Sequence, residues 1–359
     1  MIVLSCFDGI SSGRIALERA GIPVELYLAS EIDKWAIQVT QANYPGTVQL
    51  GDVCGVHAKD LPKIDMVIGG TPCTGFSFAG KQLNFNDPRS ALIFEYFRLL
   101  KEIKPKYFLL ENVIMKEEYK NAISEILGSI YPECVQQKGL FSEGRLEPAQ
   151  INSSLVSAQN RDRLYWHNFP VVGLPADRGI MLKDIIESGL TKKDKSYCID
   201  ANYAKGGNLK SYIEHGRRQL IQKDNLCIMV GEADGINGHG YNKRIYSEDG
   251  KAPTLNAGGG GNLEPKVALE NLQWRKLTPA ECEKLQTLPT GYTKEGAILY
   301  SEELAKKHEK DILKGMARLN MDRNQIITKM SNSQRYRQCG NGWTVDVIAW
   351  LFSFIDKAR

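Results

Sequence analysis

The chain has 359 residues, of which 42% are hydrophobic and 25% charged, with a formal net charge of +4. These proportions exclude a disordered chain, and the mild positive charge tolerates a polyanionic partner without requiring one. No apolar run is long enough to span a bilayer, and the N-terminus lacks the basic segment of a signal peptide. The eight cysteines form no Cys-x-x-Cys pair and lie beside no histidine cluster, so we expect reduced thiols, no metal site and a soluble cytoplasmic protein.

The chain begins with a strand, a glycine turn and a helix. Residues Ile2 to Phe7 predict the strand, residues 8–13 the turn, and apolar residues at helical spacing predict a helix that Gly21 ends. This order is typical of a nucleotide-binding α/β unit. The turn reads Phe-x-Gly-x-x-x-Gly rather than Gly-x-Gly-x-x-Gly, so a pyrophosphate cradle is not indicated.

Two acidic residues follow the next two predicted strands. Glu31 stands after the strand 25–30, and Asp52 follows the short segment 47–51. A lone acidic residue in such a place is more often a helix cap or a solvated loop residue. Two of them at successive strand ends favour an adenosine-type cofactor, with Glu31 on the ribose hydroxyls and Asp52 on the adenine amino group.

A cysteine occupies a stiff turn after the predicted core strand Ile64 to Ile68. Gly69 and Gly70 allow the backbone to turn, and Pro72 fixes the backbone just before Cys73. Such a cysteine is placed like a nucleophile, although most free cysteines are small buried hydrophobic residues. The residues alone leave open whether Cys73 is a nucleophile or a buried core residue.

The first half continues with alternating helices and strands. A helix between Ser90 and Pro105 precedes a strand at 107–110, which delivers Glu111 and Asn112 at its tip. A helix at 118–130, a strand at 134–140 and then a polar loop follow. Arg161 and Arg163 precede a strand at 164–167, and two arginines on one side of an extended segment predict a clamp for anionic groups. A surface ion pair is the alternative.

The second half is less regular. Residues 197–266 are polar and glycine-rich, with interspersed basic residues that could track a phosphate backbone or form plain loops. Thr278, Pro279 and Glu281 predict a capped helix. Residues 301–330 predict a solvated, charged helical insertion. Residues 340–343 predict a loop before a core helix that returns to the first domain.

Taken together and in this order, these segments resemble the DNA (cytosine-5)-methyltransferase family across almost the whole chain. The matching pieces are Phe7-x-Gly9, Glu31, Asp52, Gly-Gly-Thr-Pro-Cys73, Arg89-Ser90 with Glu95, Glu-Asn-Val113, Gln-Asn-Arg-Asp-Arg163, Thr254-Leu255, the Leu-Thr-Pro helix and Gly340-Asn341. The branch that includes the animal de novo enzymes and many phage enzymes is the most similar. The resemblance implies an α/β, Rossmann-like catalytic domain at 1–184, a smaller, irregular target-recognition domain at 185–330, and a C-terminal return at 331–359.

The resemblance also implies a chemistry. Cys73, presented by Pro72, would add to C6 of a cytosine flipped out of duplex DNA, and C5 would take a methyl group from S-adenosylmethionine. Glu111 would balance charge at N3, Arg163 would orient Glu111 and hold the ring carbonyl, and Arg161 would lie nearby or on phosphate. Asn112 would shape the pocket.

The remaining implied contacts concern the cofactor and the DNA. The cofactor set is Phe7, Asp8, Gly9, Ile10, Ser11, Glu31, Ile32, Asp52, Val53, Asn341, Gly342 and Trp343. The DNA set is Thr254, Leu255, Arg217, Arg218 and Arg244. Gly342 replaces the serine common in this loop and leaves extra room beside the methionine, so a bulkier or carboxylated cofactor analogue stays open. The partner is expected to be double-stranded DNA, with no membrane partner, and the chain to be a monomer.

Three competing functions stay open. An enzyme acting on RNA cytosine is the nearest, although the Cys-Phe-Thr signature of the RNA-acting branch is absent. A catalytically idle DNA-binding homologue would not need Cys73, Glu111 and Arg163. A nicotinamide oxidoreductase would leave the Pro-Cys and Glu-Asn-Val segments unexplained. The sequence does not give the recognised site, nor whether the setting is restriction–modification, a phage or an epigenetic system in a bacterial or phage-infected cell.

Overall fold

The computed structural model describes residues 1–71, 92–135, 144–189, 191, 193–205, 212, 218–222, 229–232, 244–247, 266–268 and 274–355. Within these residues the central sheet has seven strands in the order β3-β2-β1-β4-β5-β7-β6. Five are parallel: β1 (Ile2–Cys6), β2 (Leu26–Ser30), β3 (Val48–Gln49), β4 (Met66–Gly70) and β5 (Tyr107–Val113). Strand β7 (Asp162–His167) runs antiparallel to both β5 and β6 (Ala149–Asn152).

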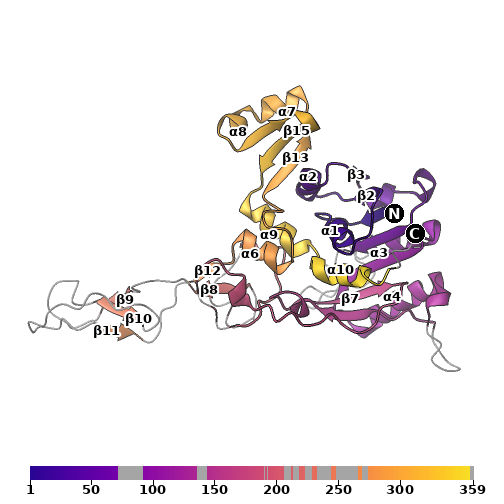
Figure 1. The fold of residues 1–359 in the computed structure, drawn as a ribbon, viewed down its shortest axis with the longest axis horizontal. Coiled ribbons are helices and arrows are strands. Elements are labelled where there is room, and N and C mark those ends of the chain that lie inside the picture. Colours follow the sequence, from indigo (N-terminus) through magenta and orange to yellow (C-terminus); the bar gives the residue numbers. More distant parts are fainter. Residues whose placement is uncertain are drawn as a thin grey trace, which may run out of the picture.

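Helices cover both faces of this sheet (Figure 1). One face carries α1 (Ser12–Arg19), α2 (Lys34–Asn43) and α10 (Val345–Phe352), and the other carries α3 (Leu92–Ile103) and α4 (Glu117–Ile130). Because strand side chains alternate, Met66 and Ile68 enter the first core and Val67 enters the second. The predicted α/β, Rossmann-like architecture is confirmed.

Two local predictions were wrong. Cys134 was predicted to begin a strand, but it ends a 3-10 turn at Pro132–Cys134, and residues 136–140 of that prediction lie outside the described part. Strand β6 was predicted as part of a polar loop. It is a strand because its backbone pairs with β7, from Ala149 opposite Tyr165 to Asn152 opposite Asp162.

The second half supplies short helices and small sheets. Helix α6 (Pro279–Leu285) has the predicted capping box: Glu281 N donates to Thr278 Oγ1 over 3.1 Å, and Thr278 N donates to Glu281 Oε2 over 2.7 Å. Strand β8 (Leu220–Gln222) pairs with β12 (Trp274–Lys276). Strands β9 (Met229–Glu232), β10 (Arg244–Ser247) and β11 (Lys266–Ala268) form a separate small sheet.

The charged segment at 301–330 is not the helical insertion that its composition predicted. It contains α7 (Glu302–Lys307) and α8 (Glu309–Leu313), but then forms β14 (Ala317–Asn320) and β15 (Gln325–Lys329), which pair with β13 (Glu295–Leu299). Ile326 and Ile327 are buried in this sheet, and Asn324 makes the turn with φ of 51°. The burial of these β-branched side chains therefore outweighs the charge pattern, and this part of the segment forms strands. Strand β13 packs against α2 (Figure 1).

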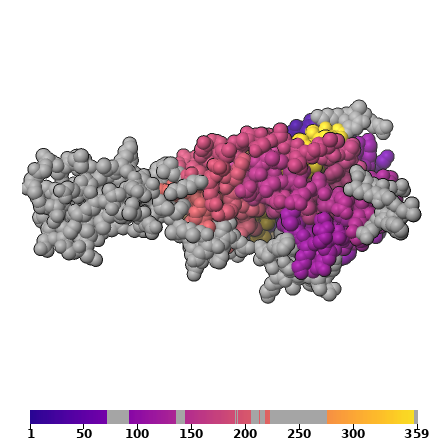
Figure 2. Space-filling view, turned by 90° about the horizontal axis from the view of Figure 1, so that it is seen from below, coloured from indigo at the N-terminus to yellow at the C-terminus, as the bar shows by residue number. Residues whose placement is uncertain are grey.

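The C-terminal part packs against the first helix of the chain. Helix α9 (Asn332–Asn341) includes Gly340 and Asn341, so these two residues belong to a helix end rather than to the predicted loop. Helix α10 follows and packs on α1. Seen from below, the segment after β7 covers one face and meets the yellow C-terminal residues at its upper edge (Figure 2). The domain boundaries at 184 and 330 stay predictions.

Within the described ranges, no helix combines the length and the apolar character that crossing a membrane requires. The same residues contain no group of three or more His, Cys, Asp and Glu side chains arranged to hold a metal ion. Six of the eight cysteines lie in the described part, and each of these six is a free thiol.

Candidate active site

One edge of the central sheet gathers most of the predicted site residues. The carboxyl ends of β1, β2, β4 and β5 meet there because these strands are parallel. Since β7 is antiparallel to β5, the start of β7 reaches the same edge. In open α/β sheets, ligands bind at this edge. The topology therefore explains why residues far apart in the sequence can share a site.

Glu111 and Arg163 form an ion pair across β5 and β7. Glu111 is opposite Tyr165 in the register, and Arg163 is opposite Val113, so the two side chains are diagonal neighbours on one face. Arg163 Nε lies 3.0 Å from Glu111 Oε1, and Glu111 is only 8% exposed. A pair this buried is screened little by solvent, and its geometry fixes the orientation of the carboxyl group.

The second oxygen of Glu111 also has a partner, which the sequence did not predict. Trp343 Nε1 donates to Glu111 Oε2 over 3.2 Å. A Cβ atom built on Gly70 would lie 2.6 Å from Trp343 Nε1 and 2.9 Å from Glu111 Oε2. Glycine at position 70 therefore leaves the space in which this contact forms.

Asn112 holds the start of the segment that carries Cys73. Its Nδ2 donates to Thr71 Oγ1 over 2.8 Å, while its Oδ1 accepts from Val113 N over 2.8 Å. Thr71 is the residue just before Pro72 and Cys73, which lie outside the described residues together with Arg89 and Ser90. Asn112 thus fixes the point from which the Pro-Cys segment leaves β4.

Arg161 does not share an anion clamp with Arg163, so that prediction was wrong. Its guanidinium donates to the carbonyl oxygens of Ile199 and Gly340 over 3.3 Å and of Gly342 over 3.0 Å. Arg161 is 5% exposed. A guanidinium buried on carbonyl groups holds the end of α9 in place and does not face a phosphate.

The turn after β1 is built around the Glu31 carboxylate. Phe7, Gly9 and Ser11 all have left-handed backbone angles, with φ of 56°, 60° and 56°. Glu31 Oε2 accepts from Gly9 N over 2.8 Å, and Oε1 accepts from Ile32 N and from the next amide, each over 2.8 Å. One carboxylate therefore joins the turns that follow β1 and β2.

Asp8 anchors the same turn from within. Tyr27 OH donates to Asp8 Oδ1 over 2.8 Å, and Ser11 Oγ donates to Asp8 Oδ2. Burial raises the pKa of the Asp8 carboxyl to about 6, although these hydrogen bonds oppose the rise. The carbonyl of Ile10 accepts from Tyr292 OH over 2.7 Å, which ties the turn to the second half of the chain.

The other predicted adenosine contacts surround this turn. Asp52 is exposed and caps a 3-10 turn at Val53–Gly55, with Cys54 N donating to its Oδ1 over 3.0 Å. Ile32 is 74% exposed, whereas Val53 is 4% exposed. Asp52 is thus a turn cap, the alternative considered from the sequence, and its position still leaves the carboxylate accessible.

Asn341 and Gly342 lie at the end of α9, close to the start of α1. Asn341 is exposed, and Gly342 is buried. A Cβ atom on Gly342 would lie 3.1 Å from Gln338 O and 3.5 Å from Ser12 Oγ. Ser12 Oγ itself is buried without a hydrogen-bond partner. The space that the missing side chain leaves is therefore bordered by an unpaired hydroxyl group.

The predicted DNA-contacting residues are not brought to this edge by any described contact. Thr254, Leu255 and Arg217 lie outside the described residues. Arg218 precedes β8 with φ of 59°, and Arg244 begins β10. Their assignment to DNA stays a prediction.

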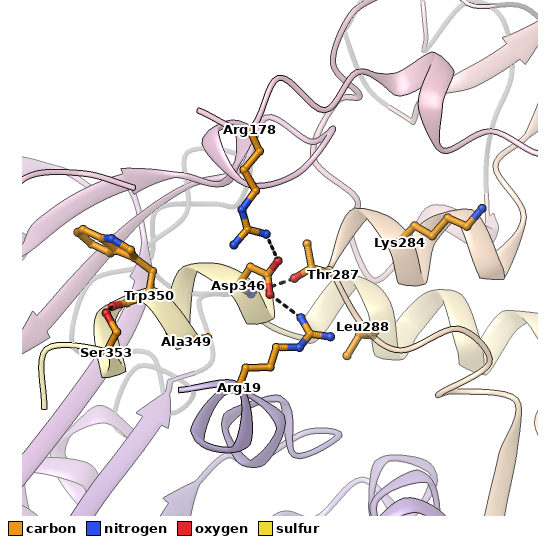
Figure 3. Close-up of a pocket in the computed structure, with 9 residues that line it drawn as sticks. All are labelled: Arg19, Arg178, Lys284, Thr287, Leu288, Asp346, Ala349, Trp350 and Ser353. Carbon is orange, nitrogen blue, oxygen red and sulfur yellow. Dashed lines mark hydrogen bonds and ion pairs between the residues drawn. The ribbon is translucent and has the colours of Figure 1, made fainter. Parts of the chain in front are cut away.

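A separate hollow of about 650 Å³ lies on the flank of the molecule, between α1, α6 and α10 (Figure 3). Arg19 and Arg178 point at Asp346 from opposite sides, and Arg19 Nη1 lies 2.5 Å from Asp346 Oδ1. The backbone N–H of Asp346 donates to Thr287 Oγ1 over 2.9 Å. These contacts tie α10 to α1 and to the segment after β7, which is a structural role.

The chain is similar to known methyltransferases. The family described as "C-5 cytosine-specific DNA methylase" matches residues 1–131. "Orphan methyltransferase M.SPRI" of Bacillus phage SPR is 30% identical over 305 residues, and the match covers 75% of this chain and 66% of that protein. "Orphan methyltransferase M.SPBetaI" of Bacillus phage SPbeta is 26% identical over 438 residues, with 98% of this chain and 96% of that protein covered.

A solved structure shares the fold along the whole chain. The methyltransferase EhMeth of Entamoeba histolytica is 15% identical, with a TM-score of 0.60, and the match covers 99% of this chain and 97% of that chain. This likeness confirms the predicted Rossmann-like methyltransferase fold. The matched segment 1–131 contains the turn after β1, Glu31, Asp52, the Pro-Cys segment and Glu111. The chain belongs to the C-5 cytosine-specific DNA methylase family.

Proposed function

We propose that this chain transfers a methyl group from S-adenosylmethionine to C5 of a cytosine flipped out of duplex DNA, with Cys73 as the nucleophile. The observation that carries the proposal is the arrangement of Glu111. Its carboxyl group is buried and paired with Arg163 at a strand end, beside the residue from which the Pro-Cys segment departs.

The chemistry follows from the weak nucleophilicity of cytosine C5. A Cys73 thiolate forms a bond to C6, and the electron pair displaced from the C5–C6 double bond makes C5 nucleophilic. Glu111 hydrogen-bonds or protonates N3 and so balances the charge that builds on the ring. After C5 has gained the methyl group, a solvent base takes the C5 proton, the C5–C6 double bond reforms, and the sulfur leaves C6 as the Cys73 thiolate. The base must leave the duplex to reach these side chains.

The turn after β1 fits an adenosine-type cofactor. Glu31 and Asp52 supply acceptors, Ile32 is an exposed apolar side chain beside Glu31, and a Cβ atom on Gly9 would meet no atom within 4 Å. The twelve residues of the cofactor set predicted from the sequence would hold the cofactor. When bound, the cofactor supplies an electrophilic methyl group. The sulfonium would gain cation–π attraction from Phe7 or Trp343, on the order of 1 kcal/mol.

The proposed partner is double-stranded DNA, bound by a monomer in the cytoplasm of a bacterial or phage-infected cell. Thr254, Leu255, Arg217, Arg218 and Arg244 would contact it. Glycine-rich segments with basic side chains can follow a phosphate backbone and reach base edges.

The test is incubation with S-adenosylmethionine labelled with tritium in its methyl group, together with either duplex DNA or total RNA. We expect label in duplex DNA, its loss in Cys73→Ala, and normal labelling by Cys134→Ala, a control thiol in a turn after α4. If RNA alone is labelled, the substrate is RNA and not DNA. Label that survives Cys73→Ala, or no label with either nucleic acid, would overturn the proposal.

A further inference from the structure

We infer that Trp343 is a positioning residue through which cofactor binding controls the orientation of the Glu111 carboxyl group. The inference deepens the proposed function and rests on it. It starts from one hydrogen bond, the donation from Trp343 Nε1 to Glu111 Oε2 over 3.2 Å.

The indole of Trp343 reaches from the cofactor turn to the catalytic carboxyl group. Its Cζ3 atom, on the six-membered ring, lies 3.4 Å from the position of a Cβ atom on Gly13, at the start of α1. Its Nε1 atom lies 2.6 Å from the position of a Cβ atom on Gly70, at the end of β4. The ring therefore lies between two glycines, one beside the turn after β1 and one beside the Pro-Cys segment.

The glycines on both sides of the ring make this placement possible. A side chain on Gly70 would overlap both the indole nitrogen and Glu111 Oε2, at 2.6 and 2.9 Å. A side chain on Gly13 would also overlap Ile68 Cδ1 at 2.4 Å. The backbone thus leaves room for a large ring in contact with both functional parts of the site.

The two donors on Glu111 come from different parts of the chain. Arg163 binds Oε1 and also donates from Nη1 to the carbonyl of Asp162 over 2.8 Å, within its own strand. Trp343 follows the end of α9, where Arg161 and Gln286 bind the carbonyl of Gly342. Trp343 belongs to the predicted cofactor set and Arg163 does not, so the proposed cofactor would contact the indole. Cofactor binding would therefore act on Oε2 through Trp343.

This arrangement predicts a defect in chemistry rather than in cofactor binding. Trp343→Phe keeps an aromatic ring between the glycines but removes the N–H group. We expect its dissociation constant for S-adenosylmethionine to stay within about twofold and its single-turnover methylation rate to fall roughly 10- to 100-fold, the range for a hydrogen bond to a charged group. Trp350→Phe, in the next helix and lining the flank hollow, is the matched control with an unchanged rate. An unchanged rate for Trp343→Phe, or a loss confined to cofactor affinity, would overturn the inference.

A second measurement is independent of methylation. In protein labelled with ¹⁵N at the indole nitrogens, the Trp343 resonance is identified by its absence in Trp343→Phe. We expect Glu111→Gln to move the Trp343 indole proton upfield, because a charged acceptor is replaced by a neutral one, and to leave the Trp350 resonance in place. S-adenosylhomocysteine added to the wild-type protein should also move the Trp343 resonance. A Trp343 resonance that responds to neither change would overturn the inference, whereas absence of DNA methylation by the wild-type protein would overturn only the proposed function.

Discussion

Arg163 and Glu111 meet across two antiparallel strands, with Nε of the arginine 3.0 Å from Oε1 of the glutamate. The contact depends on the reversal of β7 within an otherwise mostly parallel sheet, since only that reversal brings Arg163 to the carboxyl end of β5. The three residues of β5 before Glu111, Phe108 to Leu110, are fully buried. The rigid strand therefore holds one partner of the pair, and the neighbouring strand holds the other.

Substitution at this pair should impair chemistry and spare cofactor binding. Glu111→Gln removes the ionisable group, and we expect the single-turnover methylation rate to fall about 10²- to 10⁴-fold, the usual contribution of a general acid or base. Arg163→Lys should lower it at least about tenfold, because an ammonium group cannot reproduce the guanidinium geometry. Calorimetric titration with S-adenosylhomocysteine should give near wild-type affinity for both variants.

The control for this experiment is the Arg98–Glu102 pair on the exposed side of α3, with 3.0 Å between Nη1 and Oε1. Glu102→Gln removes a carboxylate of the same type away from the sheet edge and should leave the rate within about twofold. In the double variant Glu111→Gln, Arg163→Lys, the two losses should be less than additive in free energy. Fully additive losses would show that the two residues act separately.

Arg161 should matter for stability and not for the electrostatics of DNA binding. Arg161→Ala leaves buried carbonyl groups without their donor, so we expect the free energy of unfolding to fall by about 2–4 kcal/mol in urea titrations. The salt dependence of DNA affinity should keep its slope. A slope reduced by about one would instead mean that Arg161 contacts a phosphate group.

Asp8 should make stability depend on pH. Burial raises the pKa of the Asp8 carboxyl from 3.8 to about 6. The stability that this group gains from binding its proton in the folded state is therefore fully present below pH 3.8 and is lost as the pH rises through about 6. Asp8→Asn carries no such titration. Urea unfolding at about pH 4.5 and about pH 7.5 should show the wild type losing on the order of 1–2 kcal/mol relative to the variant at the higher pH. The same difference at both pH values would contradict the assignment.

Asp346 should stabilise the packing of α10 on the first part of the chain. Its carboxylate is 15% exposed and meets both Arg19 and Arg178. Asp346→Asn should lower the free energy of unfolding by about 1–3 kcal/mol, since it leaves two arginines without their anion. Glu295→Gln breaks an ion pair whose side chains are 59% and 40% exposed, and its cost should stay below about 1 kcal/mol. Equal costs for the two variants would contradict this role.

Local signals predicted the elements, and long-range contacts decided what those signals left open. The capping box of Thr278 and Glu281 and the strand–turn–helix opening are short-range patterns, and the structure has both. The pairing of β15 with β13 was not predicted because charged residues between them resemble a solvated helix. Arg161 is buried on carbonyl groups, whereas Arg163 pairs with Glu111. The two-residue spacing of these arginines gives no sign of that difference. The contact between Trp343 and Glu111 joins residues 232 positions apart, and no local pattern predicts it.

Covalent trapping tests the central claim most directly. Duplex DNA of mixed sequence, synthesised with 5-fluoro-2′-deoxycytidine in place of deoxycytidine, supplies every recognition site at once. Fluorine at C5 blocks the proton loss that releases Cys73, so the enzyme stays bound to C6 once methyl transfer has occurred. We predict a complex that survives denaturing electrophoresis, requires S-adenosylmethionine and is absent with Cys73→Ala. If the wild-type protein forms no such complex with cofactor present, a covalent role for Cys73 is contradicted.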